Sequence, residues 1–137
     1  MRRLFGLIFL ASVAVACTKV PGDGGNSHIK GQVMLEYRLV LTNPATAQNT
    51  VPAADEDVYI VYGDHTSPDD RVQTNFDGEF EFRNLRTGDY TVYVYSNDTT
   101  GSGDFASNRM PIIIETEVVD RKQVVELEPI TIYEKAN

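Results

Sequence analysis

Cysteine, histidine and tryptophan are scarce or missing in this chain of 137 residues, which holds one cysteine, two histidines and no tryptophan. A single cysteine excludes an intramolecular disulfide. A catalytic zinc ion needs about three protein ligands, and the sequence has neither a His-x-x-Glu nor a His-Glu-x-x-His pattern to supply them. The serines lie in Gly-rich loops without a Gly-x-Ser-x-Gly elbow. We therefore expect neither a zinc enzyme nor a serine hydrolase.

The sequence also has little continuous hydrophobicity. Residues 4–16 form a run of small or apolar side chains after Arg2 and Arg3, shorter than the about 20 residues that span a bilayer. A positive start, a short apolar run and small residues before a cleavage point are typical of a secretory signal. We predict that residues 1–16 are such a signal and are removed.

Ala14-Val15-Ala16-Cys17 resembles the lipobox of bacterial lipoproteins, in which the cysteine becomes the acylated N-terminus. The resemblance implies lipidation at Cys17, and three acyl chains exceed the two signals that stable anchoring requires. In this family an Asp after the cysteine favours the inner membrane, so Thr18 implies the outer membrane, with its periplasmic or surface side left open. The alternative is an ordinary signal peptide with a chance cysteine.

Basic residues are outnumbered by acidic ones. Loss of Arg2 and Arg3 with the signal leaves 10 of the 12 basic residues against 20 acidic ones, a net charge near −10. Such a domain lacks the basic surface of a nucleic-acid-binding protein, and we expect anionic head groups to repel it.

Helical periodicity is absent, and from Ile29 onward apolar residues alternate with polar ones. Residues 17–28, rich in Gly and Pro, predict a lipidated flexible tether with a reach of roughly 15 to 20 Å. The remaining residues, 29–137, predict one all-β domain, a seven-stranded antiparallel Greek-key β-sandwich. A loop is predicted over 43–57, and the strands are expected at 29 to about 42, 58–63, 71–75, 79–83, 89–96, 111–119 and 123–133.

The stretch TNFDGEFEFRNLRTGDYTVYVYS, residues 74–96, predicts two turns. Asp77 and Gly78 form a hairpin signal, because Gly tolerates positive φ and Asp caps nearby backbone N–H groups. Gly88 marks the second turn. Between them, alternation predicts that Phe80 points inward. We interpret the stretch as scaffold rather than active site.

Five sets of residues carry a resemblance to a known family: Ile29-x-Gly31-x-Val33, Pro52-Ala53 leading to Asp57-Val58-Tyr59-Ile60, Thr74-x-x-Asp77-Gly78-x-Phe80-x-Phe82, Leu85-x-x-Gly88-x-Tyr90-x-Val92 and Val125-x-Leu127. On these residues the chain resembles the carboxypeptidase regulatory-like domains, which belong to the prealbumin-like (transthyretin-like) sandwiches. The resemblance implies a structural or adhesive module, since the carboxypeptidase activity of some relatives belongs to a separate zinc domain. Asn75 departs from the family, which often has Asp there.

Some prealbumin-like relatives hydrolyse hydroxyisourate and end in a Tyr-Arg-Gly-Ser-like tail. This chain ends in Tyr133-Glu134-Lys135-Ala136-Asn137, which does not support that activity. We therefore predict a protein that is not an enzyme.

Tyr59, Tyr93 and Tyr95 are predicted to point outward and form a candidate ligand face for a sugar or a partner protein. The alternative is that they only pair across strands and stabilise the sheet. In addition, Asp98-Thr99-Thr100 resembles the Asp-Thr-x triad that some bacterial envelope proteins glycosylate, which makes Thr99 a candidate O-glycosylation site. The loop over 97–109 is longer than the family leads us to expect and is a candidate for partner contacts.

We expect no cofactor, with calcium as the alternative. Hard cations prefer several oxygen ligands in one cage. Acidic residues are frequent in the predicted loops, although their spacing fits no EF-hand; they are Asp55, Glu56, Asp57, Asp64, Asp69, Asp70 and Asp77.

These observations predict a lipid-anchored envelope protein with a non-catalytic sandwich that serves structure or protein–protein interaction. The alternative is a small carbohydrate- or peptide-binding lipoprotein assisted by calcium.

Overall fold

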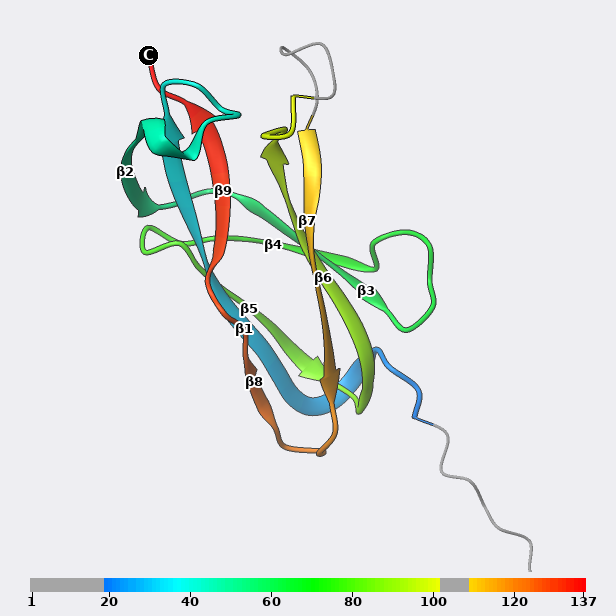
Figure 1. Cartoon of the computed structure of the whole chain (residues 1–137). Coiled ribbons are helices and arrows are strands. Elements are labelled where there is room, and N and C mark those ends of the chain that lie inside the picture. The colour runs from blue at the N-terminus through cyan, green and yellow to red at the C-terminus, as the bar shows by residue number, and fades with distance from the viewer. Residues whose placement is uncertain (1–18, 102–108) are drawn as a thin grey trace, which may run out of the picture.

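The computed structural model describes residues 19–101 and 109–137, and this part of the chain is all β apart from one short 3₁₀ helix, η1 (Pro44–Thr46). Its nine strands form two sheets (Figure 1). No helix among the described residues is long and apolar enough to cross a bilayer. The strands are β1 (Asp23–Arg38), β2 (Ala47–Pro52), β3 (Asp57–Tyr62), β4 (Asp70–Gln73), β5 (Glu79–Leu85), β6 (Gly88–Asn97), β7 (Arg109–Val118), β8 (Val124–Glu126) and β9 (Ile130–Lys135).

Two expected elements differ from the structure, and the sandwich is not wholly antiparallel as predicted, because β8 and β9 both pair with β1 in parallel. The loop predicted over 43–57 contains η1 and β2, and the last predicted strand, 123–133, is divided into β8 and β9. Alternation predicts only seven strands, because β2 has no alternating pattern and every residue in it but Val51 is exposed. Pairing with β1 therefore decides that β2 is a strand.

The long strand β1 is the centre of the first sheet. Its first half pairs with β5 and β8, and its second half pairs with β2 and β9. Register shifts near Ser27 and between Tyr37 and Arg38 interrupt the pairing, as the length of the strand predicts. The second sheet has the order β4-β3-β6-β7.

The core lies between the two sheets and is built from the alternating residues that the sequence predicted. The inward faces of β5 and β6 are buried, with Phe80, Phe82, Tyr90, Val92 and Val94 at most 4% exposed. Each fully buried aliphatic or aromatic side chain stabilises the fold by about 1.5–3 kcal/mol relative to exposure. The other buried apolar residues are Ile29, Val33, Ala53, Val58, Ile60, Tyr62, Leu85, Val118, Ile130 and Ile132.

The β4–β5 turn is present, but its capping side chain is not the predicted one. The Oδ1 atom of Asn75 accepts hydrogen bonds from the backbone N–H groups of Asp77 and Glu79, at 3.0 and 2.9 Å. No hydrogen bond of the Asp77 carboxylate is found within the described ranges. Gly78 has φ +73°, and a Cβ there would lie 2.3 Å from the carbonyl oxygen of Val33. Asn75 therefore has the capping role that we had predicted for Asp77.

The predicted tether is also shorter than expected, because β1 begins at Asp23 rather than at Ile29. Ahead of the strand, the backbone N–H of Gly22 donates to the Tyr90 hydroxyl at 2.9 Å, and the carbonyl of Gly22 accepts from the N–H of Arg86 at 2.8 Å. Pro21 packs over the predicted Gly88 turn, where an added Cβ would lie 2.8 Å from the Pro21 ring. Residues 21–28 therefore belong to the folded domain.

Candidate interaction surfaces

The three candidate tyrosines meet on the outer face of the second sheet. Tyr59 of β3 pairs with Tyr93 of β6, and Tyr93 pairs with Ile113 of the edge strand β7. Two of the tyrosines and Ile113 therefore form one row across the sheet. The rings of Tyr59 and Tyr93 are stacked, with centroids 5.1 Å apart and an interplanar angle of 13°. Tyr95 lies edge-on to both, at centroid distances of 5.8 and 5.6 Å. The outward orientation predicted from the sequence is correct, and so is the cross-strand pairing.

We call Tyr59, Tyr93, Tyr95 and Ile113 the tyrosine face. Ile113 is 57% exposed and Tyr95 is 38% exposed, whereas the other two side chains are half-buried. Burial, reinforced by the neighbouring Tyr95 and Tyr59, raises the pKa of Tyr93, so its hydroxyl is protonated at neutral pH. The face thus combines apolar surface with phenolic hydrogen-bonding groups.

Ile113 is not among the residues that the sequence predicts for this face. It is part of the run Ile112-Ile113-Ile114, in which alternation directs the two flanking side chains toward the core and Ile113 away from it. The sequence indicates the outward orientation of Ile113 only through this alternation. Its position next to Tyr93 depends on the register of a long-range strand pairing, which the sequence does not show.

The acidic loop residues that were candidate calcium ligands do not assemble. Among the described residues, no group of three or more His, Cys, Asp or Glu side chains is placed to hold a metal ion. Asp69 instead accepts hydrogen bonds from the backbone N–H of Tyr62 at 2.7 Å and from the ring of His65 at 2.8 Å. Burial alone would raise the pKa of Asp69, but these two partners outweigh it and lower the pKa. Asp57 pairs with Arg71 at 3.3 Å.

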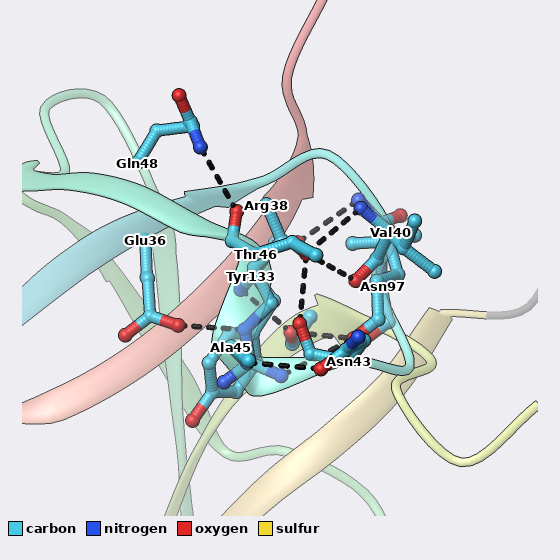
Figure 2. Close-up of polar contacts among 11 residues, drawn as sticks. Glu36, Arg38, Val40, Asn43, Ala45, Thr46, Gln48, Asn97 and Tyr133 are labelled. Carbon is cyan, nitrogen blue, oxygen red and sulfur yellow. Dashed lines mark hydrogen bonds and ion pairs between the residues drawn. The ribbon is translucent and has the colours of Figure 1, made fainter.

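The end of the sandwich that holds the β1–β2 loop and the C-terminus is fixed by polar side chains, and we call it the loop end (Figure 2). Arg38 is almost fully buried there, its Nε lies 2.6 Å from Oε1 of Glu36, and its guanidinium lies 4.1 Å from the centroid of the Tyr133 ring. Asn43 and Thr46 hold the loop between β1 and β2, where the Oδ1 atom of Asn43 accepts from the N–H of Ala45 at 3.0 Å.

Two side chains at the end of β6 join the two sheets at the loop end. The amide of Asn97 donates to the carbonyl of Tyr133 at 3.0 Å, and the N–H of Tyr133 donates to the Ser96 hydroxyl at 2.9 Å. The candidate glycosylation site Thr99 follows in a bend and is half-buried. Most of the 97–109 loop, residues 102–108, lies outside the described residues, so its predicted partner contacts stay a prediction.

Cys17 also lies outside the described residues, and its lipidation stays a prediction. The nearest described residue is Lys19, whose ammonium group forms an ion pair with Glu117 of β7. This contact raises the pKa of Lys19, mainly through the hydrogen bond to Glu117. Lys19 is thus the first described residue that contacts the domain.

No protein-family profile matches the sequence, and no curated protein matches it at a significant level. Among solved structures, the fold is similar to that of an (S)-allantoin synthase, with a TM-score of 0.43 and 12% sequence identity. The aligned region covers 82% of this chain and 43% of that one, so this chain spans less than half the length of the synthase. The function of the chain is therefore inferred from its own surfaces.

Proposed function

We propose that this chain is a lipid-anchored protein of the bacterial cell envelope, most consistent with the outer membrane, whose non-catalytic β-sandwich binds another protein through the tyrosine face. The anchor is supported by the lipobox-like Ala14-Val15-Ala16-Cys17. The relation to prealbumin-like, carboxypeptidase regulatory-like Greek-key sandwiches is part of the same proposal. It is supported by the residues quoted above and by the two-sheet all-β fold.

The exposed tyrosine face is the observation that carries the proposal. Large apolar side chains clustered on the surface of a soluble domain mark interaction sites more often than isolated ones do. Tyrosine is enriched at protein interfaces, because it offers a large contact area together with a hydrogen-bonding group. The stack of Tyr59 on Tyr93 covers one face of each ring, which favours contact with protein side chains over the stacking of a flat sugar.

The second candidate function is the binding of a small carbohydrate or peptide. It is favoured by Tyr95, which is the most exposed of the three rings and stands edge-on to both of the others. In that case glycans or peptides, rather than a protein, would occupy the tyrosine face.

The binding proposal can be tested by placing a photo-crosslinking amino acid at position 95 in the full chain within the intact envelope. We expect a discrete crosslinked protein that disappears with Ile113→Glu but persists with Val40→Glu. The two substitutions are comparable, because the side chains are 57% and 50% exposed and only Ile113 lies on the tyrosine face. A crosslink that survives Ile113→Glu contradicts the proposal. A glycan or peptide that abolishes the crosslink supports the second candidate instead.

The anchor is tested separately with Cys17→Ser. We expect this variant to lose its acyl chains by mass spectrometry and to leave the membrane fraction. Retention of the serine variant in the membrane fraction, at the level of the unsubstituted chain, contradicts the proposed lipid anchor.

A further inference from the structure

The domain begins almost immediately after the proposed lipid attachment site. Only Thr18 separates Cys17 from Lys19, and Lys19 is already paired with Glu117. Since consecutive Cα atoms are about 3.8 Å apart, the Cα of Cys17 lies within about 8 Å of the Cα of Lys19. An acyl-bearing Cys17 at a bilayer interface therefore brings this end of the sandwich against the head groups.

Three turns or segments form this end, which we call the tether end: residues 19–22, the β5–β6 turn at 86–87 and the β7–β8 turn at 119–123. They lie at the end of the molecule opposite the C-terminus (Figure 1). The β7–β8 turn is held in shape by Gln123, whose Oε1 accepts from the N–H groups of Val119 and Asp120 at 2.8 and 3.1 Å. The backbone of the turn is thus held in one conformation.

Apolar side chains are exposed at the tether end. Val20 and Val124 are each 57% exposed, and Val119 is 50% exposed. None of the three is needed to complete the core, because the core cluster consists of other residues. Exposed valines beside a membrane-proximal terminus are suited to contact the interfacial region of a bilayer.

Unpaired basic side chains accompany these valines. Arg86, Arg121 and Lys122 are exposed, and no ion pair joins any of them to an acid in the part of the chain that the structure describes. Arg86 and Arg121 both line an open cavity of about 380 Å³, together with Val20 and Leu85. Two guanidinium groups beside apolar surface match a lipid phosphate above its acyl chains.

Acidic residues are also present at the tether end. Glu117 is paired with Lys19, but Asp23 keeps its charge while it accepts a hydrogen bond from the Tyr62 hydroxyl at 3.1 Å, and Asp64, Asp89 and Asp120 are exposed there as well. The lining of the cavity that holds Arg86 and Arg121 contains no acidic side chain, so the basic charge is local to that side of the tether end. The net charge of the whole chain predicts repulsion from anionic head groups. Because the Debye length is only about 8 Å in physiological salt, the charges nearest the bilayer decide the interaction.

From these observations we propose that the tether end docks on an anionic phospholipid bilayer, with Arg86, Arg121 and Lys122 at the head groups and Val20, Val119 and Val124 in the interface. This inference rests on the proposed acylation of Cys17. Docking holds the loop end away from the membrane. The strand β6 spans 10 residues from the tether end toward the loop end, so the loop end lies about 30 Å from the docked end. The tyrosine face is therefore not in contact with lipid and is accessible to its partner.

The test uses the full acylated chain in phosphatidylglycerol-containing vesicles. Cys17 is the only cysteine, and acylation blocks its thiol, so an introduced cysteine is a unique labelling site. Val119→Cys and Val40→Cys are matched positions, since both valines are 50% exposed and they lie at opposite ends. With a polarity-sensitive dye at each, we expect several-fold stronger quenching by a lipid-borne quencher at position 119. Equal quenching at the two positions overturns the docking.

A charge reversal tests which side chains contact the lipid. Lys122→Glu and Lys135→Glu are matched, because both lysines are exposed, neither has an ion-pair partner among the described residues, and they lie at opposite ends. A basic side chain near an anionic surface contributes about a fivefold factor to binding, the equivalent of about 1 kcal/mol. We expect Lys122→Glu to lower the ratio of docked to undocked protein at least about fivefold. We expect Lys135→Glu to leave the ratio unchanged, and equal effects of the two contradict the proposed orientation.

Vesicle flotation separates this inference from the proposed function. If the chain floats with the vesicles but the dye at position 119 is not preferentially quenched, the anchor stands and the docking is wrong. If the acylated chain does not float, both the anchor and the docking are wrong. Replacement of phosphatidylglycerol by phosphatidylcholine is expected to weaken the quenching at position 119 while flotation persists.

Discussion

The two ends of the sandwich are closed by different means. At the tether end, backbone segments pack against one another directly: a Cβ at Gly25 would lie 1.9 Å from the carbonyl oxygen of Leu85, and Pro21 lies over Gly88. At the loop end, polar side chains close the structure, with Arg38 between Glu36 and Tyr133. One end is therefore closed by backbone contacts that leave no room for a Cβ atom, and the other end is closed by hydrogen bonds and ring contacts between side chains.

The difference matters for the proposed functions. Close backbone packing makes the tether end a rigid base for the proposed membrane contact, while the loop end is held by hydrogen bonds and ring contacts of side chains. The following predictions test whether the two ends differ in this way, from the largest expected effect to the smallest.

The Gly25→Ala substitution is expected to be the most damaging. The methyl group would overlap the Leu85 carbonyl, and backbone cannot move aside as a flexible side chain does. We expect the free energy of unfolding to fall by about 3 kcal/mol or more, measured by urea denaturation. Asn26→Ala, at the exposed neighbouring position, is the control and should change stability by less than about 0.5 kcal/mol. A Gly25→Ala protein of normal stability would mean that the tether end is not closed by backbone packing.

At the loop end, Arg38→Ala is expected to cost about 2–3 kcal/mol, because it leaves a largely buried Glu36 carboxylate without its partner. Arg83→Ala is a matched control: Arg83 pairs with Glu81 two residues earlier on a strand, as Arg38 does with Glu36, at 2.7 and 2.6 Å. The Arg83 side chain is 68% exposed against 10% for Arg38, so its loss should cost at most about 1 kcal/mol. Equal costs in urea denaturation would show that burial does not set the strength of the loop-end contacts.

The tether end should also weaken at alkaline pH. Burial, followed by the hydrogen bond to Asp23, raises the pKa of Tyr62 well above its usual range, and burial raises the pKa of Tyr90. A raised folded-state pKa gives stability that is complete below the unfolded pKa near 10 and is lost as pH rises beyond it. Each such tyrosine should therefore remove up to about 1.4 kcal/mol per pH unit above about 10.

Urea denaturation between neutral and strongly alkaline pH measures this loss. Tyr62→Phe removes one ionisable group and should flatten the alkaline decline, although it also loses the hydrogen bond to Asp23. If the decline of the Phe variant is as steep as that of the unsubstituted chain, ionisation of Tyr62 is not its cause.

The core and the orientation of the tyrosines could be predicted because alternation is a local property. Phe80 and Phe82 are buried, and Tyr59, Tyr93 and Tyr95 point outward, as period two requires. The β4–β5 turn was predicted for the same reason, whereas its capping atom was not. Asn75 and Asp77 both offer a side-chain oxygen at that turn, and only the three-dimensional path of the chain selects Asn75.

The length of the tether was mispredicted because a Gly-rich composition is compatible both with a flexible chain and with closely packed backbone. Glycine makes a free chain flexible, but it also lets backbones approach where a side chain would collide. The residues that Gly24 and Gly25 approach, Arg86 and Leu85, are about 60 positions away in the sequence. No local pattern contains that contact.

The sequence by itself determined the all-β class, the buried face of each main strand, the outward tyrosines and the lipobox-like N-terminus, because each of these depends on neighbouring residues. Only the tertiary structure decided that Ile113 joins the tyrosine row, that the acidic side chains of the described loops do not cluster, and that β1 begins as early as Asp23. These depend on which distant strands pair and in which register. The same long-range packing turned an expected free tether into the base on which we propose the protein rests.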